Sequence, residues 1–177
     1  MTITIRKAEI QDAPSLGHIQ VTSWRSAFRN IASDEYLDHM VSEENQAADW
    51  KEILADHEQV VFVAEERDQL VGYAWSHKED DETIEWDSEL VSMHILPEYK
   101  RQGIGRKLFA ASSTQLLIES GCTSIYLWVL EANQPSRKFY EALGGDLTGK
   151  HQIELGDREL FEVAYGWKDI RQLGITK

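Results

Sequence analysis

One short basic stretch carries two glycines and four cations in a pattern that could hold a phosphate group. The amide N–H groups in the first turn of a helix lack intrahelical partners, and the helix dipole adds partial positive charge there. Gly103 and Gly105 have no side chain, so the backbone can come close to phosphate oxygens. Full positive charges surround the same turn, on Lys100, Arg101, Arg106 and Lys107. The stretch therefore predicts a pyrophosphate-binding turn between a strand and a helix.

The spacing of the glycines excludes two common nucleotide-binding motifs. The dinucleotide-binding motif requires a third glycine three residues after the second, where this chain has Leu108. The P-loop requires Gly-Lys-Ser/Thr, which is absent. On spacing alone, a purely structural role for the two glycines in the turn is as probable as a role in phosphate binding.

The segment from Ile95 to Gly105 resembles the acyl-coenzyme A loop of the GCN5-related N-acetyltransferases, the GNAT family. In that family a hydrophobic strand is followed by a proline and then by Arg/Gln-x-x-Gly-x-Gly/Ala, and here the match is Ile95, Pro97 and Lys-Arg-Gln-Gly-Ile-Gly. Lys100 departs from the usual arginine or glutamine, but a lysine can still reach a phosphate. The resemblance implies acetyl-coenzyme A (acetyl-CoA) as co-substrate. The residues then expected to bind its phosphates are Lys100, Arg101, Gln102, Gly103, Ile104, Gly105 and Arg106.

A second segment strengthens this resemblance. The apolar, aromatic run 125–130 predicts a buried strand, and Asn133 is suited to cap the helix that follows. The layout resembles the second motif of the family, an asparagine followed seven residues later by a tyrosine, here Tyr140, and then by Glu-x-x-Gly. Gly145 stands where the family usually has phenylalanine. The resemblance places Asn133 and Ser136 among the residues that bind acetyl-CoA.

Acetyl transfer from a thioester to an amine needs a neutral amine, a hydrogen-bond donor for the oxyanion and stabilisation of the leaving thiolate. Tyr140 is the predicted donor to the thiolate, because a phenol is protonated at pH 7 and the matching tyrosine of the family points at the sulfur. The alternative is that Tyr140 only packs on the sheet. The resemblance also implies a bulge in the strand before the glycine turn, which would expose the backbone N–H groups of Met93, His94 and Ile95.

Glu89 is the candidate general base. It lies six residues before Ile95, so strand alternation predicts that both side chains share one face. Glu85 and Asp87 have the same parity, and all three carboxylates could instead belong to a solvated acidic loop. His94 has the opposite parity from Ile95, which favours packing on the other face.

The resemblance extends to polyamine acetyltransferases of the family, which are also acidic and carry aromatic residues in this region, and it implies a small cationic amine such as a polyamine as the acceptor. Trp24, Phe28 and Tyr36 could form an aromatic wall that attracts a cation, although Trp24 and Phe28 fit a core position equally well. With 31 acidic and 18 basic residues the chain has a net charge of −13, which disfavours nucleic acid and anionic membranes as partners. Two alternatives stay open: a peptide or ribosomal-protein N-acetyltransferase, and a non-catalytic sensor or structural module that binds acyl-CoA.

The elements that must position these residues alternate along the chain. Strands are predicted at 2–6, 60–65, 70–75, 89–95, 125–130, 150–155 and 159–167. Helices are predicted at 12–28, 33–40, 43–54 and 104–121 and after Asn133, with Asp12 as a cap and with Ile104, Leu108, Ala111 and Ile118 on one buried face. The order matches the GNAT fold, an α/β fold with a mixed, mostly antiparallel central sheet of about seven strands flanked by helices. A single domain is predicted to span residues 1–177.

The remaining features of the sequence favour a protein of the reducing cytoplasm. The one cysteine, Cys122, cannot form an internal disulfide and is expected to be a packed, inert thiol at a helix end. No apolar run approaches the ~20 residues of a membrane span, and the first residues lack a signal-peptide pattern. The histidines show no metal-ligand spacing. Members of the family often dimerise through their last strands, where Trp167 could contribute to a homodimer interface.

Overall fold

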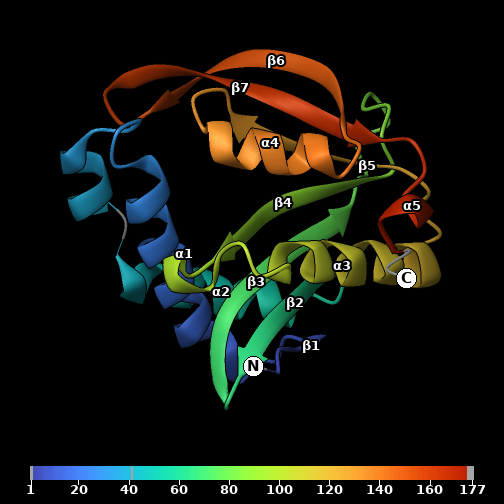
Figure 1. Cartoon of the computed structure of the whole chain (residues 1–177), viewed down its shortest axis with the longest axis horizontal. Coiled ribbons are helices and arrows are strands. Elements are labelled where there is room, and N and C mark those ends of the chain that lie inside the picture. Colours follow the sequence, from blue (N-terminus) through green and yellow to red (C-terminus); the bar gives the residue numbers. More distant parts are fainter. Residues whose placement is uncertain (1, 41, 175–177) are drawn as a thin grey trace.

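A seven-stranded sheet forms the centre of the molecule, in the order β1-β2-β3-β4-β5-β7-β6 (Figure 1). The computed structural model describes residues 2–40 and 42–174. The strands are β1 Thr4–Lys7, β2 Gln59–Glu66, β3 Gln69–Lys78, β4 Ser88–Ile95, β5 Ile125–Leu130, β6 Asp146–Leu155 and β7 Arg158–Trp167. Neighbouring strands are antiparallel except β4 and β5, which are parallel. The predicted mixed, mostly antiparallel sheet is confirmed.

The helices follow the predicted order. They are α1 Ala13–Phe28, α2 Glu43–Ala55, α3 Ile104–Ser120, α4 Gln134–Ala142 and α5 Arg171–Gly174, with short helical turns at Ile10–Asp12, Tyr36–Met40 and Pro97–Tyr99. The four-residue α5 was not predicted, because it is too short to show a helical period. Among the described residues, no helix is long and apolar enough to cross a membrane.

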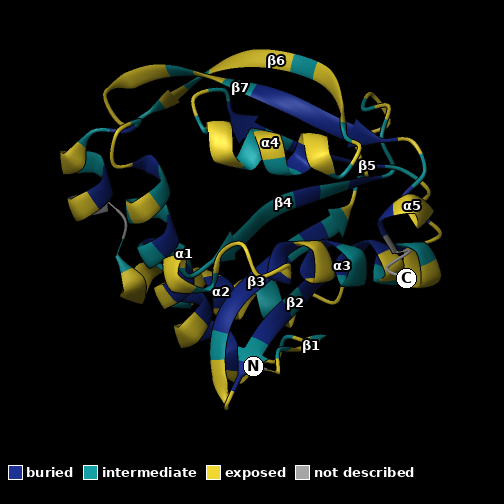
Figure 2. Cartoon of the chain, viewed as in Figure 1, coloured by how far each residue is buried: buried dark blue, intermediate teal, exposed yellow. Residues whose placement is uncertain are grey.

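The helices cover both faces of the sheet. On one face, Leu108 of α3 and Tyr140 of α4 share a core with Leu127 of β5. On the other face, Leu16 of α1 packs in a second cluster that contains Tyr73 of β3. Figure 2 shows that the C-terminal half of β7 is buried, whereas β6 at the edge of the sheet and the outer side of α4 are largely exposed.

The buried stripe of α3 differs from the predicted face at two residues, Ala111, which is only partly buried, and Ile118. The helix buries Ile104, Leu108, Phe109, Ser112, Ser113 and Leu116. The expectation for Ile118 was wrong, since this side chain is 75 % exposed. Ile118 lies two residues after Leu116, which is about 200° around the helix and hence on its opposite side. Gly121 ends α3 in a left-handed conformation, as glycine at a helix C-terminus should.

Asp12 occupies the predicted N-cap position of α1 but makes no capping hydrogen bond. Its carboxylate instead accepts hydrogen bonds from Arg6 at 2.7 and 3.0 Å and from the N–H of Glu9 at 2.8 Å. Burial opposes ionisation of Asp12, yet these hydrogen bonds lower its pKa overall. The ion pair therefore joins β1 to the start of α1.

An extra residue in β4 determines which side chains face which side of the sheet. Trp75 pairs with Ser92 whereas Ser76 pairs with Leu90, so Val91 is bulged out of the register. Glu89 therefore lies on the face of α1 and α2, opposite to Ile95. The prediction that these two side chains share a face was wrong, because simple alternation does not count the extra residue. The bulge that the family resemblance implied is present.

Candidate functional site

A gap opens between β4 and β5 at the centre of the sheet. The two parallel strands are paired at one position, Glu89 with Tyr126. Figure 1 shows that they separate from this point toward their C-terminal ends. Helix α3 follows β4 and helix α4 follows β5, so the N-termini of both helices lie at the open end of the gap.

The backbone of β4 directs two N–H groups into this gap. The N–H of Leu96 donates to the carbonyl of Val71 at 2.9 Å, which fixes the hydrogen-bonded positions of the ladder with β3. Because these positions alternate, the N–H of His94 faces its partner Tyr73, whereas those of Met93 and Ile95 point away from β3. Met93 and Ile95 can therefore offer donors in the gap, and the His94 amide belongs to the sheet.

The turn before α3 presents a row of backbone N–H groups without partners. Arg101 and Gly103 both have positive φ, at 66° and 78°, and no side chain caps the helix. The first helical hydrogen bond runs from the N–H of Lys107 to the carbonyl of Gly103 at 3.3 Å. Among the described residues, none accepts a hydrogen bond from the N–H groups of residues 101–106. Successive free N–H groups in such a turn form a concave site suited to an anion.

The side chains of the turn support the same conclusion. Lys100, Arg101, Arg106 and Lys107 are all exposed, and no described carboxylate forms an ion pair with any of them. The Gln102 side chain donates to the carbonyl of Glu98 at 3.2 Å and so closes the turn on itself. Free amides and unpaired cations at one helix N-terminus fit the diphosphate of a nucleotide-like cofactor.

Gly105 is required by packing as well as by any close approach of a cofactor. A Cβ at this position would lie 3.1 Å from Phe139 Cζ of α4 and 3.3 Å from Ile95 Cδ1 of β4. By contrast, a Cβ on Gly103 would meet no atom within 4 Å, but its left-handed backbone favours glycine. Substitution of Gly105 would disturb the core, so removal of charge tests the turn more cleanly.

The double variant Arg101→Gln, Arg106→Gln is expected to weaken acetyl-CoA binding by tenfold or more. Each charge-assisted hydrogen bond that is lost contributes about 1.5–3 kcal/mol. Isothermal titration at two salt concentrations measures the loss, and the remaining affinity should depend less on salt. The matched control is Arg171→Gln, whose guanidinium pairs with Asp169 on a different part of the surface. Unchanged affinity in the double variant would mean that these cations do not bind the cofactor.

Helix α4 carries the second set of predicted residues. The Asn133 side chain accepts a hydrogen bond from the N–H of Ser136 at 3.3 Å and caps the helix, as predicted. Tyr140 is 8 % exposed, and its ring lies 6.3 Å from those of Tyr165 and Trp167. Burial raises the pKa of Tyr140, so the phenol stays protonated at neutral pH. Its hydroxyl forms no hydrogen bond with another described residue, which leaves it available as a donor.

A strip of carboxylates lies on the face of the sheet opposite to α3 and α4. Its members are Glu79 at the end of β3, Glu89 of β4 and Glu162 of β7, and we call it the carboxylate strip. The hydroxyl of Tyr126 donates to Glu79 Oε2 at 3.0 Å. The side chains of Glu89 and Glu162 are 22 % and 24 % exposed, so solvent reaches both. Burial raises the pKa of Glu162, and the negative charge of Glu89 contributes in the same direction.

Two histidines accompany the carboxylate strip. His77 Nε2 lies 3.5 Å from Glu89 Oε2, and His151 Nε2 lies 3.3 Å from Glu162 Oε2. His77, Tyr126 and Glu162 were not among the predicted site residues. Only strand pairing brings them beside Glu89, and the signal that could have found His77 is its place two residues after Trp75, in line with a predicted strand.

The three predicted aromatic residues belong to one apolar cluster at the end of β5. Phe28 is buried there with Leu130, and Trp24 and Tyr36 are partly buried against it. The Trp24 and Phe28 rings meet edge to face, with centroids 5.2 Å apart. Tyr36 covers Gly156 in the turn between β6 and β7. The core interpretation therefore holds for Phe28, while Trp24 and Tyr36 are only partly buried.

His94 packs against α1, as its parity predicted. Its Nε2 accepts a hydrogen bond from Trp24 Nε1 at 3.1 Å, and its ring lies 5.6 Å from that of Tyr73. Burial, assisted by the charge of Lys100, lowers the pKa of His94 to about 4. The imidazole is therefore neutral at pH 7, with its proton on Nδ1.

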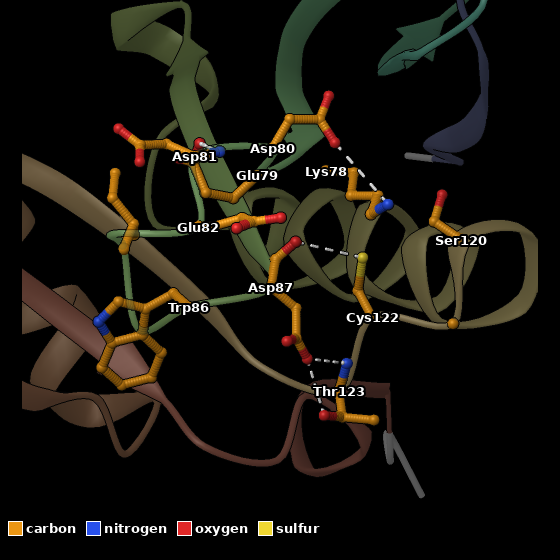
Figure 3. Close-up of a pocket in the computed structure, with 12 residues that line it drawn as sticks. Lys78, Glu79, Asp80, Asp81, Glu82, Trp86, Asp87, Ser120, Cys122 and Thr123 are labelled. Carbon is orange, nitrogen blue, oxygen red and sulfur yellow. Dashed lines mark hydrogen bonds and ion pairs between the residues drawn. The ribbon is translucent and has the colours of Figure 1, made fainter.

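A cavity of about 590 Å³ lies at the other end of β3 and β4, away from the glycine turn (Figure 3). Asp87 at its border accepts hydrogen bonds from the N–H and hydroxyl of Thr123 and from the N–H of Ser124. These bonds lower the pKa of Asp87 and tie the acidic loop to β5. The thiol of Cys122 donates to the Asp87 carbonyl at 3.4 Å, and burial raises its pKa. Asp87 and Cys122 thus have structural roles here.

Comparison with known proteins decides the family. A model of the Acetyltransferase (GNAT) family matches residues 21–145, most of the chain and both motif-bearing segments. The chain belongs to the GNAT acetyltransferase family. This GNAT protein is therefore an N-acetyltransferase that uses acetyl-CoA as co-substrate, and its seven-stranded sheet is the fold of the family.

Individual relatives cover most of the length of this GNAT protein. It is 31 % identical over 172 residues to the uncharacterized N-acetyltransferase YuaI of Bacillus subtilis, covering 97 % of this chain and 96 % of the relative. It is 25 % identical over 144 residues to a spermidine N(1)-acetyltransferase of Thermoplasma acidophilum, covering 79 % and 86 %. Among solved structures, the PaiA N-acetyltransferase of the same organism in complex with coenzyme A superposes with a TM-score of 0.72 at 22 % identity, covering 94 % and 100 %.

Proposed function

We propose that this acetyltransferase acetylates a primary amine of a small, multiply charged cation such as a polyamine. The observation that carries the proposal is the carboxylate strip, because it lies on the face opposite to α3 and α4, is reached by solvent, and extends to the closed end of the gap at Glu89. Carboxylates spaced along a surface attract a chain of ammonium groups through both charge and hydrogen bonds. The similarity to a spermidine acetyltransferase supports the same substrate class.

Each residue of the site has a defined part in this proposal. Acetyl-CoA, when bound, supplies an activated thioester. The turn 100–106 and the capped start of α4 hold the cofactor, and the N–H groups of Met93 and Ile95 are placed to donate to a carbonyl oxygen. Glu89 takes the proton from the attacking amine, and Tyr140 gives a proton to the departing sulfur.

Aromatic side chains complete the proposed acceptor site. Trp24 and Tyr36 belong to the apolar cluster around Leu130, and Leu130 is the cross-strand partner of Glu162. The face of an aromatic ring attracts an ammonium group by up to about 2 kcal/mol when water is excluded. We therefore place the methylene segments of the acceptor against this cluster and its charged nitrogens against the carboxylates.

A thiol-release assay with a panel of amines tests the proposal. We expect polyamines to give the highest kcat/KM, and a monoamine of similar length to be at least tenfold poorer because it cannot engage a second carboxylate. Higher salt should reduce the advantage of the polyamine. A preference for short peptides with a free N-terminus would replace this proposal with peptide acetylation. Stabilisation by acetyl-CoA without thiol release from any amine would instead indicate a sensor.

A further inference from the structure

We propose that His77 and Glu89 act as one proton-accepting pair, in which Glu89 meets the amine and His77 is the positioning residue that finally holds the proton. The proposal rests on the function proposed above, in which Glu89 takes a proton from the acceptor. His77 belongs to neither family motif and lies on β3, which precedes both motifs in the chain.

The fold places the two side chains next to each other. His77 and Glu89 are direct cross-strand partners of β3 and β4, just outside the bulge at Val91. Cross-strand partners point to the same face, and Nε2 of His77 lies 3.5 Å from Oε2 of Glu89. The bulge is essential for this placement, since it turns Glu89 away from Ile95 and toward the acceptor face.

The hydrogen bonding of His77 determines which nitrogen titrates. Nδ1 lies 2.7 Å from the backbone carbonyl of Lys78, and a carbonyl can only accept. Nδ1 therefore carries a hydrogen atom, and Nε2 is the nitrogen that gains and loses a proton. When both groups are unprotonated, the Nε2 lone pair faces a carboxylate, so the pair gains stability by taking up one proton.

Negative charges around the pair favour its protonated form. Negative groups near His77 come from three elements, Glu89 on β4, Glu79 beyond β3 and Asp56 before β2, and Glu162 on β7 interacts with Glu89. Tyr126 on β5 is held neutral because burial and nearby carboxylates raise its pKa, and the ammonium of Lys78 pairs with Asp80 at 3.7 Å. The hydrogen bond with Glu89 raises the pKa of His77 to about 8, against the opposing effect of burial.

The proposed step conserves atoms and charge. An N–H bond of the amine breaks, its electron pair stays on nitrogen, and the proton moves through Glu89 Oε2 to form an N–H bond at His77 Nε2. As nitrogen bonds to the carbonyl carbon, the C–S bond of the thioester would break with its electron pair on sulfur, which would take the proton of Tyr140. The side chains are 27 % and 22 % exposed, so water can then remove the proton. Because the raised pKa means that the pair is already protonated below about pH 8, it accepts a proton only above that pH.

Histidine titration by NMR tests the pair without any acceptor. The chain has six histidines, and the His77 signal is the one missing from His77→Gln. We expect this signal to titrate near pH 8 as the Nδ1–H tautomer in the wild type, and to fall toward the ordinary value of about 6.5 in Glu89→Gln. A His77 that titrates near 6.5 in both proteins would overturn the pair.

The pH dependence of kcat/KM tests the role of the pair. The wild type should show an ascending limb near pH 8, and His77→Gln should lose that limb together with roughly tenfold or more of its activity at pH 9. His18→Gln is the matched control, because His18 also contacts a glutamate, Glu43, at 3.1 Å but on the exposed side of α1. A wild-type profile in His77→Gln would overturn the role.

The two measurements separate this inference from the proposed function. If no amine releases thiol, the proposed function fails and with it the proton-accepting role, whatever the NMR titration shows. If polyamines are acetylated but His77→Gln keeps the wild-type limb, the function stands and only the role of His77 is overturned.

Discussion

Replacement of Glu89 by glutamine is expected to lower kcat/KM by about 10²–10⁴-fold, the range that a general base typically contributes. An amide of the same shape cannot accept a proton, so the loss falls on the chemical step. Acetyl-CoA affinity should stay nearly constant, because Glu89 lies on the face opposite to Ile95 and the glycine turn. Steady-state thiol release between pH 7 and 10, together with titration of the cofactor, measures both quantities.

A control with the same chemical change separates loss of the base from loss of charge. Glu43→Gln removes an exposed carboxylate at the start of α2 that contacts His18 of α1. It should leave kcat/KM within about twofold. Retention of full activity by Glu89→Gln across the same pH range would remove Glu89 from the mechanism and shift attention to a bound water or another carboxylate of the strip.

The second large effect is expected from Tyr140→Phe, which should lower kcat by roughly 10²-fold and leave acetyl-CoA affinity nearly unchanged. The hydroxyl has no partner among the described residues, so its removal costs no hydrogen bond within the protein. The ring keeps its contacts with Tyr165 and Trp167. Thermal unfolding should therefore be close to that of the wild type, while single-turnover kinetics show the loss.

The raised pKa of Tyr140 also predicts how the activity depends on pH. A phenol donates only while protonated, and burial moves its ionisation to higher pH, so its activity as an acid should persist through pH 10. Tyr165→Phe is the control, because that hydroxyl bonds with Glu141 and Arg137 and its loss should reduce stability more than kcat. If Tyr140→Phe loses stability but keeps turnover, Tyr140 is a packing residue only.

The parts of the site that depend on local backbone geometry could be predicted from sequence. Gly103, with its positive φ, and Asn133, as a helix cap, occupy positions that few residue types satisfy, so their identities reveal the turn and the start of α4. The charged residues of the turn could also be predicted, since all four lie between residues 100 and 107.

The parts that depend on pairing between distant strands could not be predicted. Nothing in the identity of Val91 marks it as a bulged residue, and one extra residue reverses the face of Glu89 relative to Ile95. The partnership of Glu89 with His77 follows from the register of β3 and β4 and from the loop between them. Trp24 and Phe28 fitted both a core and a binding role by their spacing, and only the packing around Leu130 distinguishes them.

The contact of Gly105 with Phe139 has a consequence for engineering this enzyme. Phe139 directly precedes Tyr140 in α4. The turn proposed to bind the cofactor therefore contacts, through Gly105, the helix that bears the proposed acid. A larger residue at position 105 would displace α4 and with it Tyr140, so it would change the rate of acetyl transfer as well as the affinity for the cofactor. Efforts to alter cofactor choice should therefore leave this glycine in place and vary the exposed cations, where recognition can be adjusted without displacing the phenol.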